Sequence, residues 1–206
     1  MRHFSRMIVL SALLAAGLAL AACQKSAGYS AQPDDMSLGN PNAKVTVVEY
    51  ASVGCPICAK WQADVYPAFK AKYIDTGKIH YVFREMLVGS QGEVAVAASG
   101  FLLARCAGPG KYFPVVDAIF LDQAQAFQAP RETLANIGKS MGMTDAQYQA
   151  CITDDKAIKA LNDRVQRHIQ DDKVDATPTF VVNGKALPAG LQPLTALDAA
   201  IAAAGK

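Results

Sequence analysis

The stretch Lys44-Val-Thr-Val-Val-Glu-Tyr-Ala-Ser-Val-Gly-Cys-Pro-Ile-Cys58 decides the fold of this 206-residue chain. Its first seven residues are rich in β-branched side chains and almost continuously apolar, which predicts a strand buried on both faces. After a short turn, Pro56 stands where the first turn of a helix tolerates proline. The stretch therefore predicts a buried strand that passes directly into a helix, with two cysteines at the junction.

The residues that follow predict how this unit continues. Residues 56–73 contain no glycine and carry apolar side chains at helical spacing, although Pro67 should kink the helix. The run Ile79-His-Tyr-Val-Phe83 predicts a second buried strand. A strand, helix and strand connected over this length form a parallel pair with a right-handed crossover.

The middle of the chain predicts helices. From residue 88 to residue 175, alanine, leucine and polar side chains dominate, and strand patterns are absent. Thr144-Asp-Ala-Gln147 matches a capping box, so a short helix should begin there. Apolar residues at helical spacing from Ile158 to Ile169 indicate an amphipathic helix after it.

The strand pattern returns at Thr179-Phe-Val-Val182. Asn183-Gly184 is typical of a hairpin turn, so residues 185–187 should form the return strand. Residues 193–204 predict a C-terminal helix. The order β-α-β, helical block, β-β-α predicts an α/β chain. We expect a thioredoxin-like fold over residues 43–206 with an inserted helical domain at about residues 88–175.

The N-terminus carries an export signal. Arg2 and Arg6 precede an apolar run that ends in Leu20-Ala-Ala-Cys23, which resembles the bacterial lipoprotein box. We expect residues 1–22 to be a signal peptide and Cys23 to become a lipidated N-terminus. An ordinary cleaved signal and an uncleaved anchor are the alternatives, because the length of the apolar run is borderline for a membrane span.

Residues 23–42 are polar and predict a flexible tether, with the folded part beginning near Ala43. Gln24 would be the second residue of the mature lipoprotein, and glutamine at this position in Gram-negative lipoproteins favours sorting to the outer membrane. We therefore expect a lipid-anchored protein on the periplasmic face of a bacterial membrane, or otherwise a soluble periplasmic protein. Without the signal, basic and acidic residues balance, so the charge predicts no nucleic-acid partner.

The chain has five cysteines. Assigning Cys23 to lipid leaves an even set of four in an oxidising compartment. The natural partition pairs Cys55 with Cys58, and Cys106 with Cys151. The second pair would be a structural disulfide that ties two helices of the insertion. Two separate buried thiols are the alternative for this pair.

Cys55 and Cys58 at a helix start predict thiol–disulfide exchange. Unpaired N–H groups and the helix dipole favour a thiolate at Cys55, which is then the nucleophile. Cys58, one turn further in, should be the resolving cysteine. Zinc would need a second ligand pair, which the spacing of the other cysteines and histidines does not provide. We expect no metal and no cofactor; a purely structural Cys55–Cys58 disulfide is the remaining alternative.

Two segments resemble the DsbA-like disulfide oxidoreductases. Val48-Glu-Tyr-Ala-Ser-Val-Gly-Cys-Pro-Ile-Cys58 looks like the active-site segment of that family, and Ala176-Thr-Pro-Thr-Phe-Val-Val-Asn-Gly184 looks like its cis-proline loop. The resemblance implies that the peptide between Thr177 and Pro178 is cis and faces Cys55. The Thr177 backbone could then pair with an extended substrate chain. Without the resemblance, Pro178 is a proline that opens a strand.

Glu49 is an acid in an otherwise apolar strand, and a buried acid needs a reason. In thioredoxin-like proteins an acid near this place assists proton transfer beneath the cysteine pair, so the resemblance implies this role for Glu49. A surface carboxylate at the strand end is the alternative. Strong oxidases of this family resemble one another in the motif Cys-Pro-His-Cys, and Ile57 stands at the place of its histidine. A histidine there would help to hold the thiolate, so the resemblance implies a less stabilised reduced form here. Thr177 occurs in isomerases of the family as well as in some oxidases.

The resemblance implies an enzyme, a protein thiol:disulfide oxidoreductase. The leading expectation is a dithiol oxidase of exported proteins that a DsbB-like quinone reductase in the membrane reoxidises. A disulfide isomerase or reductase, kept reduced by a DsbD-like partner, is the alternative. A non-catalytic thioredoxin-like binding lipoprotein is the third. Only a short tether precedes the predicted domain, which favours a monomer.

Overall fold

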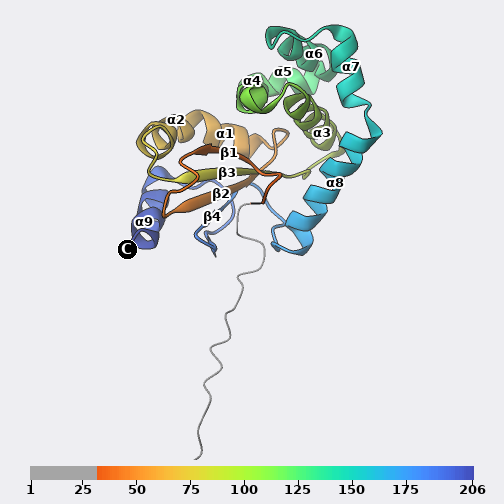
Figure 1. Ribbon diagram of the computed structural model, residues 1–206. Coiled ribbons are helices and arrows are strands. Elements are labelled where there is room, and N and C mark those ends of the chain that lie inside the picture. Colours follow the sequence, from red (N-terminus) through yellow and green to blue (C-terminus); the bar gives the residue numbers. More distant parts are fainter. Residues whose placement is uncertain (1–31) are drawn as a thin grey trace, which may run out of the picture.

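In the computed structural model, which describes residues 32–206, the predicted strand–helix–strand unit forms the centre of the sheet (Figure 1). β2 (Thr46–Ala51) and β3 (His80–Glu85) pair in parallel. They are connected by α1 (Pro56–Asp64), α2 (Tyr66–Phe69) and the π-helical turn η1 (Lys70–Ile74). The predictions about the signal peptide, Cys23 and Gln24 concern residues outside the described range.

Three further strands complete the sheet in the order β1-β3-β2-β4-β5. β1 (Met36–Gly39) runs antiparallel to β3, and β4 (Thr179–Val182) runs antiparallel to β2. β5 (Lys185–Ala186) returns beside β4 after the turn at Asn183-Gly184. Both turn residues have positive φ, 45° and 81°, which is the backbone that a two-residue hairpin turn of this kind requires. The hairpin prediction is confirmed.

The predicted start of the folded part is wrong. The sequence predicts a tether up to residue 42, but Met36–Gly39 form the edge strand β1. Met36 and Leu38 pack against the core from this strand. A four-residue strand that contains Ser37 and Gly39 has too few apolar side chains for a strand pattern to stand out, and it is stabilised by pairing with β3.

A helical block separates β3 from β4. It consists of α3 (Gln91–Cys106), the short 3-10 turn η2 (Pro109–Lys111), α4 (Tyr112–Leu121), α5 (Gln123–Gln128), α6 (Pro130–Ser140), α7 (Asp145–Ile152) and α8 (Asp155–Gln170). Figure 1 shows α3 to α7 as a lobe beside the sheet, and α8 running from that lobe back towards the sheet. Thr144 caps α7 in the predicted capping box. Among residues 32–206, none of the helices combines the length and apolar character needed to cross a bilayer.

The predicted apolar stripe on α8 faces the protein only in part. Leu161 and Val165 are buried as expected, but Ile169 is exposed. Arg164 and His168 are buried instead. Compared with the predicted orientation, α8 is rotated about its axis. Its polar side chains Arg164 and His168 therefore contact Glu85, the buried last residue of β3.

The larger of two apolar clusters within residues 32–206 spans the sheet and the insertion. Trp61 on α1 packs on Phe180 of β4 with the ring centroids 4.7 Å apart, and its indole N–H donates to the Gln192 carbonyl at 3.0 Å. Tyr81 of β3 contacts Phe113 of α4 with the ring centroids 6.2 Å apart. The helix α9 (Leu194–Ala204) contributes Leu197 and Ile201 to the same core. The insertion thus packs directly on the elements that carry the cysteines.

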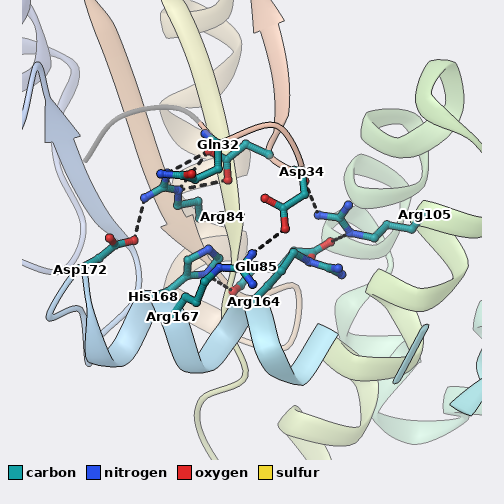
Figure 2. Close-up of polar contacts among 10 residues, drawn as sticks. Gln32, Asp34, Arg84, Glu85, Arg105, Arg164, Arg167, His168 and Asp172 are labelled. Atoms are coloured by element: carbon teal, nitrogen blue, oxygen red, sulfur yellow. Dashed lines mark hydrogen bonds and ion pairs between the residues drawn. The ribbon is translucent and has the colours of Figure 1, made fainter. Parts of the chain in front are cut away.

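The last two residues of β3 are buried charges that the sequence analysis missed. Arg84 donates to Asp35 at 2.9 Å and to Asp172 at 2.7 Å. Asp172 also accepts a 2.8 Å hydrogen bond from the Tyr50 hydroxyl. Arg84 therefore ties the segment before β1 and the segment before the Thr177–Pro178 loop to the centre of the sheet (Figure 2).

Glu85 fastens the insertion to the same strand. Its carboxylate accepts hydrogen bonds from Arg105 of α3 at 2.6 Å and from Arg164 of α8 at 2.8 Å. The Tyr112 hydroxyl donates to it at 3.0 Å. Burial lowers the pKa of His168 to about 4, and the neutral ring lies with Nδ1 3.0 Å from the Glu85 carbonyl oxygen (Figure 2).

Candidate active site

The turn after β2 presents Cys55 at the start of α1. The Cys55 N–H donates to the Ser52 carbonyl at 2.9 Å, which closes the turn. Cys55 has extended backbone angles as the N-cap residue, and Pro56 opens the helix. Gly54 is required by packing, because a Cβ there would lie 2.1 Å from the Glu93 carbonyl oxygen of α3. The loop is therefore enclosed between the sheet and the insertion.

The two cysteines differ in exposure. Cys55 is partly exposed, whereas Cys58 is fully buried. The Cys55 thiol lies 3.7 Å from the Thr177 carbonyl oxygen. Only Cys55 is placed where an incoming sulfur could reach it, which fits the predicted division between nucleophile and resolving cysteine.

Hydrogen bonding favours the thiolate at Cys55. The Cys58 thiol, acting as donor, lowers the pKa of Cys55 the most, and partial burial opposes this. The Thr177 side chain and the backbone N–H groups of Cys58 and Ile57 lower it further, so that it falls to about 5. The pKa is low although Ile57 stands in place of a histidine.

The buried cysteine has the opposite tendency. Burial raises the pKa of Cys58 far above its ordinary value, and the hydrogen bond and charge of Cys55 add to the rise. At neutral pH the reduced pair is therefore one thiolate and one thiol. This asymmetry is what exchange requires, because the exposed sulfur attacks while the buried sulfur keeps its proton.

The Thr177–Pro178 peptide is cis, and Thr177 lies opposite Cys55. The Thr179 hydroxyl donates to the Ala176 carbonyl at 2.8 Å, and the Gly190 N–H donates to the Pro178 carbonyl at 2.8 Å. These bonds hold the loop from both sides. The loop presents its backbone beside the reactive sulfur.

Glu49 is buried within the sheet and is not a surface carboxylate. The Tyr81 hydroxyl donates to its Oε2 at 2.5 Å. Burial raises the pKa of Glu49 to about 8, and the charge of Asp117 on α4 adds to the rise. The charge of Glu49 in turn contributes to the raised pKa of Cys58, so the two groups are close enough to influence one another.

Asp117 is a site residue that the sequence analysis missed. Burial raises its pKa, and Gln62 of α1 donates to its Oδ1 at 2.8 Å. With Gln62 and Tyr66 it lines a cavity of about 270 Å³ between α1 and α4. Nothing in the sequence around Asp117 marks it as partly buried, because an aspartate in an amphipathic helix normally faces water.

Cys106 and Cys151 form a disulfide with their Cα atoms 5.9 Å apart. It joins the last residue of α3 to α7. Within residues 32–206 no group of three or more His, Cys, Asp or Glu residues is arranged to hold a metal ion.

Comparisons with known proteins agree with this geometry. A family model described as Thioredoxin matches residues 31–203. A Rickettsia bellii protein, provisionally named a protein-disulfide oxidoreductase, is 36% identical over 159 residues, which is 76% of this chain and 60% of that protein. The chain spans 55% of the length of a similar Rickettsia typhi protein. It therefore covers little more than half of these relatives.

Solved structures show the same fold. The alpha-DsbA1 of Wolbachia pipientis superposes with a TM-score of 0.74 at 24% identity, over 86% of this chain and 94% of that protein. A thioredoxin-like oxidoreductase from Silicibacter pomeroyi superposes with a TM-score of 0.64 at 25% identity, over 84% of this chain and 93% of that protein. The predicted α/β fold with a helical insertion is confirmed.

Proposed function

Because the chain belongs to the thioredoxin family, we propose that it catalyses thiol–disulfide exchange on exported proteins through Cys55 and Cys58. The observation that carries the proposal is the asymmetry of the pair. Cys55 is accessible with a pKa lowered to about 5, and Cys58 is buried with a raised pKa. A structural disulfide or a binding module needs no such difference.

The direction that we propose is oxidation of substrate dithiols. A substrate thiolate attacks Cys55 Sγ of the Cys55–Cys58 disulfide, and Cys58 leaves with the electron pair and is protonated. The second substrate thiolate then attacks the substrate sulfur of the mixed disulfide, and Cys55 leaves as a thiolate. The substrate gains one disulfide while the enzyme pair takes up two electrons. A membrane partner of the DsbB-like quinone reductase type would reoxidise the pair.

The low pKa of Cys55 supports this direction. A group that is stable as a thiolate is a good leaving group, and its stability favours the reduced enzyme over the disulfide. The interactions that lower this pKa come from Cys58, the Thr177 side chain and backbone N–H groups. The absence of a histidine at Ile57 therefore does not remove the driving force for oxidation.

Glu49 is the proposed proton donor and acceptor for Cys58. With a pKa of about 8 it is mostly protonated at neutral pH, so it holds a proton in the interior where Cys58 needs one. Thr177 is proposed to pair its backbone with an extended substrate segment beside Cys55, as an added strand. The cis Pro178 supports this role by turning the loop towards the sulfur.

The remaining proposals concern the location of the protein, its membrane anchor, its oligomeric state and its second disulfide. We place the protein on the periplasmic face of a bacterial membrane, anchored by lipid at Cys23 after removal of residues 1–22, and acting as a monomer. The lipoprotein-like Leu20-Ala-Ala-Cys23 segment supports the anchor. The Cys106–Cys151 bond is proposed as a structural disulfide that does not turn over.

Measuring the reduction potential of the Cys55–Cys58 couple against glutathione tests the direction. We expect a value closer to about −120 mV, the range of a strong oxidant, than to about −270 mV, the range of thioredoxin. A value near that of thioredoxin would contradict the oxidase and favour a reductase that is kept reduced by a DsbD-like partner. An isomerase would be recognised by its ability to refold a protein with scrambled disulfides.

A further inference from the structure

Gln123, the first residue of α5, reaches from the insertion to the loop that carries Cys55. Its Nε2 donates to the Val53 carbonyl oxygen at 2.8 Å and to the Cys55 carbonyl oxygen at 3.1 Å. The side chain is only 7% exposed. Both N–H groups of one buried amide are thus committed to two carbonyls of the same loop, 68 and 70 residues away in the sequence.

The second of these bonds lies at the N-cap of α1. The Cys55 carbonyl oxygen already accepts the first bond of the helix, from the Ala59 N–H at 3.1 Å. Gln123 supplies a further donor to the same oxygen, which offsets part of the negative end of the carbonyl dipole next to Cys55 Sγ. Donors that are fixed in a partly buried site act strongly on nearby charge because water does not screen them. Their presence favours a negative charge on the sulfur.

Other contacts of the insertion with this loop are steric. Gly54 lies against the Glu93 backbone of α3, and a Cβ added to Gly100 would lie 3.1 Å from Val53 Cγ2. These contacts limit where the loop can lie, but they do not orient its carbonyl groups. The two hydrogen bonds from Gln123 do orient them.

We propose that Gln123 is a positioning residue for the exchange reaction: through its two hydrogen bonds the helical insertion holds the Val53–Cys55 loop and sets the reactivity of the Cys55 sulfur. This inference rests on the proposed thiol–disulfide exchange and adds a role for the insertion within it. Gln123 does not touch the sulfur and acts through the loop carbonyls.

The test compares two variants with a matched control on the same helix. Gln123→Leu keeps the approximate size of the side chain and removes both donors. Gln123→Glu keeps the shape and replaces donors by a carboxylate. Gln125→Leu, at an exposed position of α5, is the control. Thiolate absorbance near 240 nm is followed against pH in the reduced proteins, together with the rate of reaction with a small aromatic disulfide.

We expect the Gln123→Leu midpoint to rise by about half a pH unit or more, which is about a threefold loss in the thiolate-to-thiol ratio at any given pH. Gln123→Glu should raise the midpoint as well, because a protonated carboxyl keeps one donor for two carbonyls and an ionised one repels the thiolate. Gln125→Leu should titrate as the wild type does. Thermal unfolding separates positioning from support of the fold, since a purely structural residue would lower Tm without moving the midpoint.

The inference is overturned if Gln123→Leu and Gln123→Glu both keep the wild-type midpoint, whether or not their Tm falls. If Gln123→Leu does not fold, Gln123→Met, which is unbranched like glutamine and also lacks both donors, takes its place. Failure of the proposed function is recognised separately, because wild-type Cys55 would then show neither a low midpoint nor exchange.

Discussion

Neutralising Glu85 should strongly destabilise the protein. The side chain is 1% exposed, and it pairs with Arg105 at 2.6 Å and Arg164 at 2.8 Å. In the Glu85→Gln variant both guanidinium groups lose their carboxylate, while the size and shape of the side chain are kept. Removing one partner of a buried ion pair costs about 3–5 kcal/mol because the remaining charge stays buried.

The structure points to the lower end of that range. The Arg164 side chain is 9% exposed, but the Arg105 side chain is 25% exposed and can recover part of its hydration. We therefore expect a loss of about 3 kcal/mol, a large fraction of the 5–15 kcal/mol that is typical of a folded domain. Unfolding of the oxidised protein in urea, followed by circular dichroism at pH 7, measures the loss.

The matched control removes an exposed pair. Lys60 and Asp64 lie one helical turn apart with side chains 58% and 53% exposed, so Asp64→Asn should cost no more than about 0.5 kcal/mol. A free energy of unfolding for Glu85→Gln within about 1 kcal/mol of the wild type would contradict this expectation, and so would an equal loss in the two variants. Either result would mean that the carboxylate at the end of β3 does not fasten the insertion.

Three other predictions concern the cysteines and their proton donor. Glu49→Gln should slow exchange by the oxidised protein below pH 8, with the ratio of variant to wild-type rate approaching one above pH 8 where Glu49 is ionised; a ratio that is constant with pH would contradict the proton-transfer role. Replacing Cys106 and Cys151 by serine should lower the free energy of unfolding by about 4 kcal/mol, because the bond closes a loop of 45 residues; a change below about 1 kcal/mol in urea unfolding would refute this. Folding lowers the pKa of Cys55 from 9.0 to about 5, so the thiolate stabilises the folded reduced protein. This stabilisation is complete above pH 9 and is lost as the pH falls through 5. Urea unfolding at pH 5, 7 and 9 should therefore show the stability of the reduced form rising relative to the oxidised form, and a difference independent of pH would count against it.

Local signals in the sequence were sufficient for much of the fold. The β-branched run before Cys55 and the Asn183-Gly184 turn each specify their structure within a few residues, and both predictions are confirmed. The edge strand that begins at Met36 was missed because it is short and depends on pairing with β3. Arg84 and Glu85 were missed because charged residues at a strand end normally face water, and their partners lie far away in the sequence.

The candidate site also contains residues that the sequence identifies and residues that it does not. Cys55 and Cys58 are evident from a four-residue motif, and the cis bond before Pro178 follows from a family resemblance rather than from any local rule. Gln123 and Asp117 reach the site only because the insertion folds back on α1. No pattern within α4 or α5 distinguishes these polar side chains from the solvent-exposed ones beside them.

The reactivity of Cys55 is tested most directly by alkylation of the reduced protein. Iodoacetamide pulses from pH 4 to pH 9, with the modified cysteines identified by peptide mass spectrometry, report the thiolate of each residue separately. Cys55 should be alkylated with a midpoint of about pH 5, while Cys58 stays unmodified throughout. A Cys55 midpoint near pH 9, or reaction at Cys58 before Cys55, would contradict the assignment of Cys55 as the nucleophile.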